Sequence, residues 1–120
     1  LGKSYDWGSD KLPKRPLHIT AMGSDATGKR ELSEGLVRAA DLLVTDSRIQ
    51  TKERGEFADV INNGVVKLED VVEIGELVTR NELQRRKDSD NEDCRLTIFD
   101  TSGVSVQDCV IAMMVNAALK

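Results

Sequence analysis

Three short polar segments carry the side chains of this sequence that are best suited to chemistry. Each ends or follows a short apolar run: Met22-Gly23-Ser24-Asp25, Asp46-Ser47 and Asp100-Thr101-Ser102-Gly103. A carboxylate such as that of Asp25 can transfer protons when burial moves its pKa toward neutrality. Gly23 and Gly103 have no Cβ, so a ligand can approach their backbone closely. Lys29 offers a flexible positive charge to a phosphate.

These features also have a purely structural interpretation. Gly-Ser-Asp after a strand is typical of a turn with capping contacts, and Asp100-Thr101-Ser102-Gly103 is a suitable N-cap for a following helix. Lys29 would then be a solvated surface lysine. His18, the only histidine, falls inside an apolar run, which favours a structural role. Spacing alone leaves both interpretations open.

Composition narrows the class of protein. The 120 residues allow one small domain, and 17 basic against 21 acidic residues give a net charge of −4, which argues against a nucleic-acid partner. The apolar runs are too short for a membrane span, and we do not expect the start of the sequence to be a signal peptide, because Lys3, Asp6 and Asp10 interrupt the place of an apolar core. Cys94 and Cys109 have no zinc-site spacing or nearby base, so we expect unpaired packing residues and a cytoplasmic protein.

Motifs for other chemistries are missing from the sequence. It contains no Gly-x-Gly-x-x-Gly, P-loop, paired histidines, Cys-x-x-Cys or serine nucleophile elbow. We therefore expect no metal site. The residues alone indicate only a sheet edge with a candidate aspartate.

Hydrophobic periodicity predicts the elements that would position these segments. Short apolar runs predict buried strands at residues 17–22, 42–46 and 96–100, with the first buried on both faces. Spacing and capping residues predict a helix at 33–40 with Ser33 as its N-cap, and a helical segment at 47–63 that is broken near Gly55 and closed by Asn62-Asn63-Gly64. They also predict a helical turn at 68–73 and helices at 75–80 and 104–120. Residues 1–16 are expected to form an irregular leader and 80–95 a surface loop.

Strands that alternate with helices predict an α/β fold with a parallel sheet and right-handed crossovers. Three strands are few for such a sheet, so we expect half of the fold to be missing and the first strand to lack a neighbour. The last helix is apolar nearly all round and is expected to lie in a core or an interface. The chain should accordingly associate or expose apolar surface.

Four stretches in order resemble the ornithine cyclodeaminase/mu-crystallin family. Residues 18–32 (HITAMGSDATGKREL) are similar to its strand–Gly-x-Asp–Lys–Glu-Leu segment, and residues 97–103 (TIFDTSG) with Gln107-Asp108 resemble its strand–Phe-Asp-Ser-x-Gly–helix segment. Residues 40–46 (ADLLVTD) and Arg54-Gly55-Glu56 fall between them at the family's spacing. The resemblance covers residues 17–120.

The resemblance implies the C-terminal half of a Rossmann-like domain, a partial three-layer αβα unit that binds NAD or NADP in longer, dimeric enzymes. Asp25 would be the acid/base residue in contact with the substrate. Met22, Gly23 and Ser24 would line the nicotinamide, and Lys29 would contact the cofactor.

Two further positions depart from the family pattern. Thr101 stands where a serine usually meets the cofactor, and Ser102 where a small apolar residue flanks the substrate. Both departures bear on which amino acid is the substrate.

The implied reaction removes hydride from the α-carbon of an amino acid. In the cyclodeaminase, a side-chain amine then attacks the imine, ammonia leaves and hydride returns, as in the conversion of ornithine to proline. A ketimine reductase or alanine dehydrogenase would stop at the redox step, and ectoine-utilisation members would act on a diamino acid derivative. A different class also stays open, in which the 120-residue chain is a non-catalytic scaffold or oligomer contact. The full-length parent is expected to be a homodimer.

Overall fold

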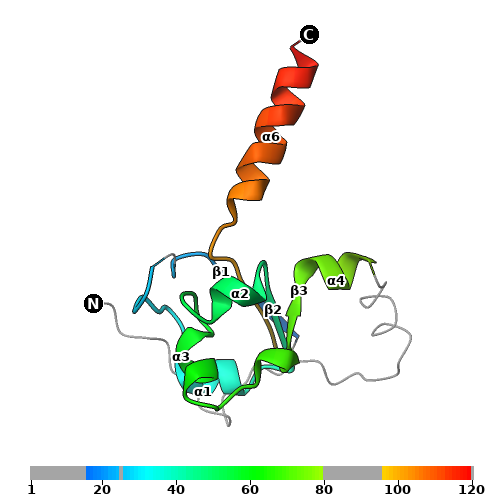
Figure 1. The fold of residues 1–120 in the computed structure, drawn as a ribbon. Helices are drawn as coiled ribbons and strands as arrows, with labels where there is room; N and C mark the ends of the chain where they lie inside the picture. Colours follow the sequence, from blue (N-terminus) through cyan, green and yellow to red (C-terminus); the bar gives the residue numbers. More distant parts are fainter. Residues whose placement is uncertain (1–15, 25, 80–95, 120) are drawn as a thin grey trace.

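A computed structural model describes residues 16–24, 26–79 and 96–119 of the chain. Within them lies a four-stranded, fully parallel sheet in the order β1-β4-β2-β3 (Figure 1). Its strands are β1 (Leu17–Ala21), β2 (Leu42–Thr45), β3 (Val71–Glu73) and β4 (Leu96–Asp100). The predicted α/β class and parallel sheet are confirmed. The expected leader and the expected loop at 80–95 lie, apart from Pro16, outside the described residues.

The helices agree in part with the capping signals of the sequence. The expected N-cap role of residues 100–103 for the last helix is wrong, because its N-cap is Val104 and no side chain caps it. They are α1 (Glu34–Arg38), α2 (Arg48–Thr51), α3 (Ala58–Asn62), the 3₁₀ helix η2 (Leu68–Asp70), α4 (Ile74–Thr79) and α6 (Ser105–Ala118). Ser33 caps α1 by accepting a hydrogen bond from the amide of Leu36. The predicted break near Gly55 separates α2 from α3. Gly64 ends the α3 segment at a φ of 71°, a left-handed conformation that glycine adopts without strain.

Apolar side chains cover both faces of the sheet, which gives the described part its three layers. On one face, Leu43 and Ile98 pack against residues of α1 and α3, among them Leu36 and Val60. On the other face, Leu42 and Val44 of β2 form a smaller cluster with Leu77 of α4. Phe99 and Val72 lie at its margin. The sheet is therefore the middle of an αβα sandwich, as the Rossmann-like resemblance implied.

The expectation that β1 is buried on both faces is wrong. His18 and Thr20 are exposed, whereas Leu17, Ile19 and Ala21 pack on the α1 and α3 side. His18 Nδ1 lies 2.6 Å from the hydroxyl of Thr97 on β4. The helix on the exposed side, α4, packs against β3 at the opposite edge of the sheet, so it does not reach β1.

The prediction of three strands is also wrong, because β3 is a fourth. Residues 68–73 were expected to form one helical turn, but only Leu68–Asp70 is helical and the chain then extends into β3. Val71, Val72 and Glu73 pair with Leu43, Val44 and Thr45 of β2. Three residues are too few to show a strand period, and the pairing with β2 determines their conformation.

The last helix, α6, projects away from the sheet (Figure 1). Every described residue of α6 is exposed, including large apolar side chains: Val106, Val110, Ile111, Met113, Met114 and Val115. The expected exposure of apolar surface is thus confirmed, whereas burial of α6 in the core of this chain is not found. Cys109 lies on this helix as an exposed free cysteine, so its expected role in packing is wrong for the chain as described.

Membrane crossing can be judged for the part of the chain that the structure describes. None of the helices there has the length and apolar character that a span across a bilayer requires.

Candidate functional site

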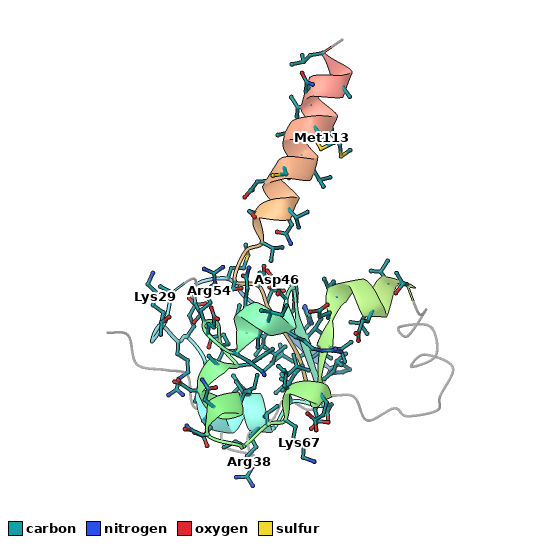
Figure 2. The ribbon with its side chains drawn as sticks, viewed as in Figure 1. Lys29, Arg38, Asp46, Arg54, Lys67 and Met113 are labelled. Atoms are coloured by element: carbon teal, nitrogen blue, oxygen red, sulfur yellow. The ribbon has the colours of Figure 1, made fainter. Side chains whose placement is uncertain are left out.

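The three polar segments meet at one edge of the sheet, as the parallel strands require. Ala21 at the end of β1 and Thr45 at the end of β2 both lie in register with Asp100 at the end of β4. The segment after β4 therefore lies between those after β1 and β2. Lys29 and Asp46 lie on this side of the body, and Arg38 and Lys67 on the opposite side (Figure 2). We call this edge the carboxyl rim.

The segment after β1 is held by a buried carboxylate from the chain after β2. Glu56 has 0% of its surface exposed. Its Oε1 accepts a 2.7 Å hydrogen bond from the amide of Glu31, and its Oε2 accepts one of 2.8 Å from the amide of Leu32. The hydroxyl of Ser24 lies 2.6 Å from Glu56 Oε1 and 2.7 Å from the carbonyl of Lys29, so its single proton has two acceptors. One side chain thus links both ends of the segment 24–32.

A second buried carboxylate, Asp100, holds Glu56 in turn. Asp100 Oδ2 accepts a 2.9 Å hydrogen bond from the amide of Glu56, and 1% of the Asp100 residue is exposed. Gly55 has a φ of 99°, and a Cβ there would collide with Asp100 Oδ2. Glycine is therefore required at this position for both conformation and space.

Burial raises the pKa of Asp100 from 3.8 to about 7. The largest cause is the loss of hydration around the charged form. The hydrogen bond from Glu56 acts in the opposite direction, while repulsion from the carboxylates of Glu56 and Asp46 raises the pKa further. Asp100 Oδ1 is buried and has no hydrogen-bond partner among the described residues, which fits a group that is costly to ionise.

The segment after β4 is held by side chains that follow β2. Asp46 Oδ2 accepts hydrogen bonds from the hydroxyl of Thr101, at 2.9 Å, and from the amide of Gly103, at 3.0 Å. The hydroxyl of Ser102 donates to Gln50 Oε1 at 3.1 Å, and Arg54 donates to the same oxygen at 2.7 Å. Residues 46–56 therefore anchor both of the neighbouring segments.

The sequence-predicted site residues occupy different environments on the carboxyl rim. Met22 is 72% exposed, and the amide of Gly23 donates to Glu31 Oε2. Ser24 is 1% exposed, and its hydroxyl faces Glu56 inside the protein. Lys29 is exposed. Asp25 lies outside the described residues, but both of its chain neighbours belong to the segment that Glu56 holds.

Sequence reasoning did not assign the anchoring roles of Glu56, Gln50 and Asp46. Asp46 had been noted only as a rim residue, and Glu56 only as part of the family resemblance. One signal was available: Glu56 is a charged residue directly before Phe57-Ala58, and a charge beside a buried aromatic needs a partner. Its partners lie 24 to 32 positions away in sequence, so the pattern could not identify them.

Metal binding is not supported by the geometry of the described ranges. Among these residues, no three His, Cys, Asp or Glu side chains gather in a way that could hold an ion. The carboxyl rim offers carboxylates, hydroxyls, backbone amides, an exposed methionine and the exposed Lys29.

The model of the ornithine cyclodeaminase/mu-crystallin family matches residues 10–120. The alanine dehydrogenase of Archaeoglobus fulgidus is 37% identical over 82% of the chain and 29% of its own length, and the iminosuccinate reductase of Paracoccus denitrificans is 37% identical over 85% and 30%. The ornithine cyclodeaminase of Brucella abortus is 29% identical over 93% and 28%. The chain thus spans less than a third of the length of these curated relatives.

Two solved structures of such enzymes also match in three dimensions. The crystal structure of the Paracoccus denitrificans iminosuccinate reductase in complex with NAD⁺ gives a TM-score of 0.70 at 37% identity, covering 83% of the chain and 29% of that structure. The NAD-bound dimer of an archaeal alanine dehydrogenase gives 0.66 at 36% identity, covering 82% and 29%. The family match over most of the sequence and the likeness in fold agree, and the chain belongs to the ornithine cyclodeaminase/mu-crystallin family.

Proposed function

We propose that this chain is the part of a longer NAD-dependent enzyme that presents the nicotinamide and the acid/base residue to an amino-acid substrate. The observation that carries the proposal is the carboxyl rim. Two adjacent segments, 22–32 and 101–103, are each held by buried or half-buried side chains. The same chain is 37% identical to an alanine dehydrogenase and to an iminosuccinate reductase. Rigid segments at the carboxyl ends of parallel strands are where α/β proteins bind ligands.

The carboxyl rim fits the nicotinamide end of the cofactor. Met22 exposes 72% of its surface beside Gly23, which offers a flat apolar contact for a ring. A Cβ at Gly103 would meet no atom within 4 Å, so there is open space over that backbone. NAD, when bound, would accept a hydride from the substrate and, in a cyclodeaminase, return it. NADP remains the alternative cofactor.

The residues proposed for binding have defined hydrogen-bonding capacity. The hydroxyl of Thr101 donates to Asp46, so its lone pairs remain to accept a donor from the cofactor. The hydroxyl of Ser102 donates to Gln50 and in the same way can accept from the substrate. Gly23 and Ser24 contribute backbone to the nicotinamide side, and Lys29 contributes charge.

Asp25 is proposed as the residue that moves protons. Its place directly after Ser24 puts it in the held segment, next to the residue that meets Glu56. There it would take a proton from the substrate amine as hydride leaves the α-carbon, and return one when the product forms. The same residue would contact the substrate.

The first candidate reaction is that of an ornithine cyclodeaminase, with loss of ammonia and ring closure. The second is an amino-acid dehydrogenase or imino-acid reductase. Relatives support both candidates: the alanine dehydrogenase and the iminosuccinate reductase are 37% identical to the chain, and an uncharacterised cyclodeaminase of Sinorhizobium fredii is 38% identical. The longer enzyme is further proposed to be a cytoplasmic homodimer, supported by the dimeric archaeal relative.

A substrate panel tests this proposal. The longer enzyme would be assayed for nicotinamide reduction or oxidation with ornithine, with alanine, with pyruvate plus ammonia and with iminosuccinate, and for proline formed from ornithine. We expect turnover with NAD and at least one of these substrates. Proline formation would select the first candidate, and net NADH formation or consumption the second. An enzyme that binds no NAD and turns over none of them would support the scaffold interpretation instead.

A further inference from the structure

The buried carboxylate of Glu56 has an unusual set of partners. Its three side-chain hydrogen bonds in the described structure all go to one segment, to Ser24 at the start and to Glu31 and Leu32 at the end. That segment lies outside any helix or long strand, and residues 26–31 within it are exposed. A segment with so little burial of its own takes its shape from the few groups that it does contact.

Burial makes this arrangement specific. A carboxylate with no exposed surface is tolerated only where donors face both of its oxygens. Two backbone amides and one hydroxyl supply those donors, at 2.6 to 2.8 Å. Moving the amide of Leu32 would leave Oε2 without its donor, and moving that of Glu31 would leave Oε1 with the hydroxyl of Ser24 alone, so displacement of these amides is unfavourable.

The backbone of Glu56 is itself held by the sheet. Asp100 at the end of β4 accepts the hydrogen bond from the amide of Glu56, and Gly55 makes room for that contact. The position of the sheet is thereby transmitted to the segment 24–32 through two buried side chains. Asp100 belongs to the strand whose next residue, Thr101, is proposed to meet the cofactor.

We propose that Glu56 is a positioning residue that sets the location of Asp25 relative to the nicotinamide and the substrate. Asp25 follows Ser24 directly and is enclosed in the segment whose two ends Glu56 holds. Glu56 does not touch the reacting atoms in this account. It acts through the backbone of the segment. The inference rests on the proposed function, because it assigns a role in the reaction that Asp25 is proposed to perform.

The test is the isosteric variant Glu56→Gln in the longer enzyme. The amide nitrogen of glutamine would face a donor where the carboxylate oxygen accepts one, so the segment must shift. A displacement of the order of 1 Å costs about 10²-fold in rate. We expect kcat to fall about 10²-fold, the KM for NAD to change less than about 3-fold, and the pH profile of kcat to move, because Asp25 would meet the substrate from an altered position.

A matched control is Glu53→Gln. Glu53 lies on the same connection and is exposed, and the hydrogen bonds that it forms in the described structure use its backbone: its carbonyl accepts from Thr27 and its amide donates to the carbonyl of Gln50. It should leave kcat and the pH profile unchanged. A folded Glu56→Gln enzyme whose kcat and pH profile match those of Glu53→Gln would overturn the proposal.

A second variant keeps the test decisive if Glu56→Gln does not fold. Ser24→Ala removes one of the three donors to Glu56 and should lower kcat less, by about 10-fold, with the KM for NAD unchanged. Combined with Glu56→Gln in a folded protein, its effect should be much less than additive, because both act through one contact. A Ser24→Ala enzyme with wild-type kcat would refute the positioning role. If the KM for NAD alone rises, Ser24 lies at the cofactor instead.

Hydrogen exchange separates this inference from the proposed function. In the longer enzyme, the amides of Glu31 and Leu32 should exchange about 10²-fold more slowly than in an unstructured peptide, since both donate to a buried carboxylate. Slow exchange in a longer enzyme that shows no activity on amino acids would reject the proposed function and retain the anchoring role of Glu56. Fast exchange at the amides of Glu31 and Leu32 would reject the anchoring role of Glu56, whatever the activity of the enzyme.

Discussion

Asp100 should make the stability of the chain depend on pH in an unusual direction. Its pKa is raised from 3.8 to about 7, mainly by burial. In the unfolded chain, Asp100 loses its proton near pH 4, whereas in the folded chain it keeps the proton until about pH 7. Between these values the folded state binds more protons, so the free energy of unfolding falls as pH rises. Above about pH 7 the full cost of the buried charge is present.

The size of this effect follows from the two pKa values. At 1.36 kcal/mol per pH unit, the interval from 3.8 to about 7 corresponds to about 4 kcal/mol as an order of magnitude. Asp100→Asn removes the charge and keeps an oxygen to accept the hydrogen bond from the amide of Glu56. The variant should therefore be of similar stability to the wild type near pH 4, and more stable by a few kcal/mol, about 4 at most, at pH 8.

Urea unfolding of the 120-residue chain at several pH values measures this difference. The exposed Asp108→Asn on α6 is the matched control, and its difference from wild type should stay within about 0.5 kcal/mol at every pH. An Asp100→Asn difference that is equally constant from pH 4 to pH 8 would refute the reasoning. It would mean that Asp100 is hydrated, or paired, in the folded protein.

Three further predictions follow from the same structure. NAD⁺ titrated against the 120-residue chain should show no measurable binding by calorimetry, because the sequence contains no Gly-x-Gly-x-x-Gly. Tight binding would show that the carboxyl rim alone suffices to bind NAD⁺. Gly55→Ala should lower the free energy of unfolding by about 1–3 kcal/mol in urea, since alanine is strained at positive φ and would press on Asp100; an unchanged midpoint would contradict that geometry. Thr101→Val should cost about 1–3 kcal/mol in the same assay by depriving Asp46 of a donor, whereas no loss would mean that the bond does not form.

Some elements could be predicted because their signals are local. The runs that form β2 and β4 are apolar over four or five residues, and the helices carry N-caps such as Ser33 and ends such as Gly64. The three polar segments at one edge followed directly from the parallel arrangement of the strands. None of this needed knowledge of distant contacts.

Other features depend on distant partners, which a pattern does not show. β3 has three residues and is defined by its pairing with β2. The exposed side of β1 reflects which helices reach that face of the sheet, not its own composition. Glu56 looks like an ordinary surface glutamate until Ser24, Glu31 and Leu32 are found around it. Asp100 likewise needed the fold before its burial and raised pKa could be seen.

The central claim is that Asp25 moves protons for an amino-acid reaction on the carboxyl rim, and one comparison tests it most directly. Turnover and NAD affinity would be measured for Asp25→Asn in the longer enzyme, beside Asp70→Asn at the amino end of β3. The account predicts a loss of about 10²–10⁴-fold in kcat for Asp25→Asn with NAD affinity nearly unchanged, and normal turnover for Asp70→Asn. Turnover by Asp25→Asn at the wild-type rate would contradict it.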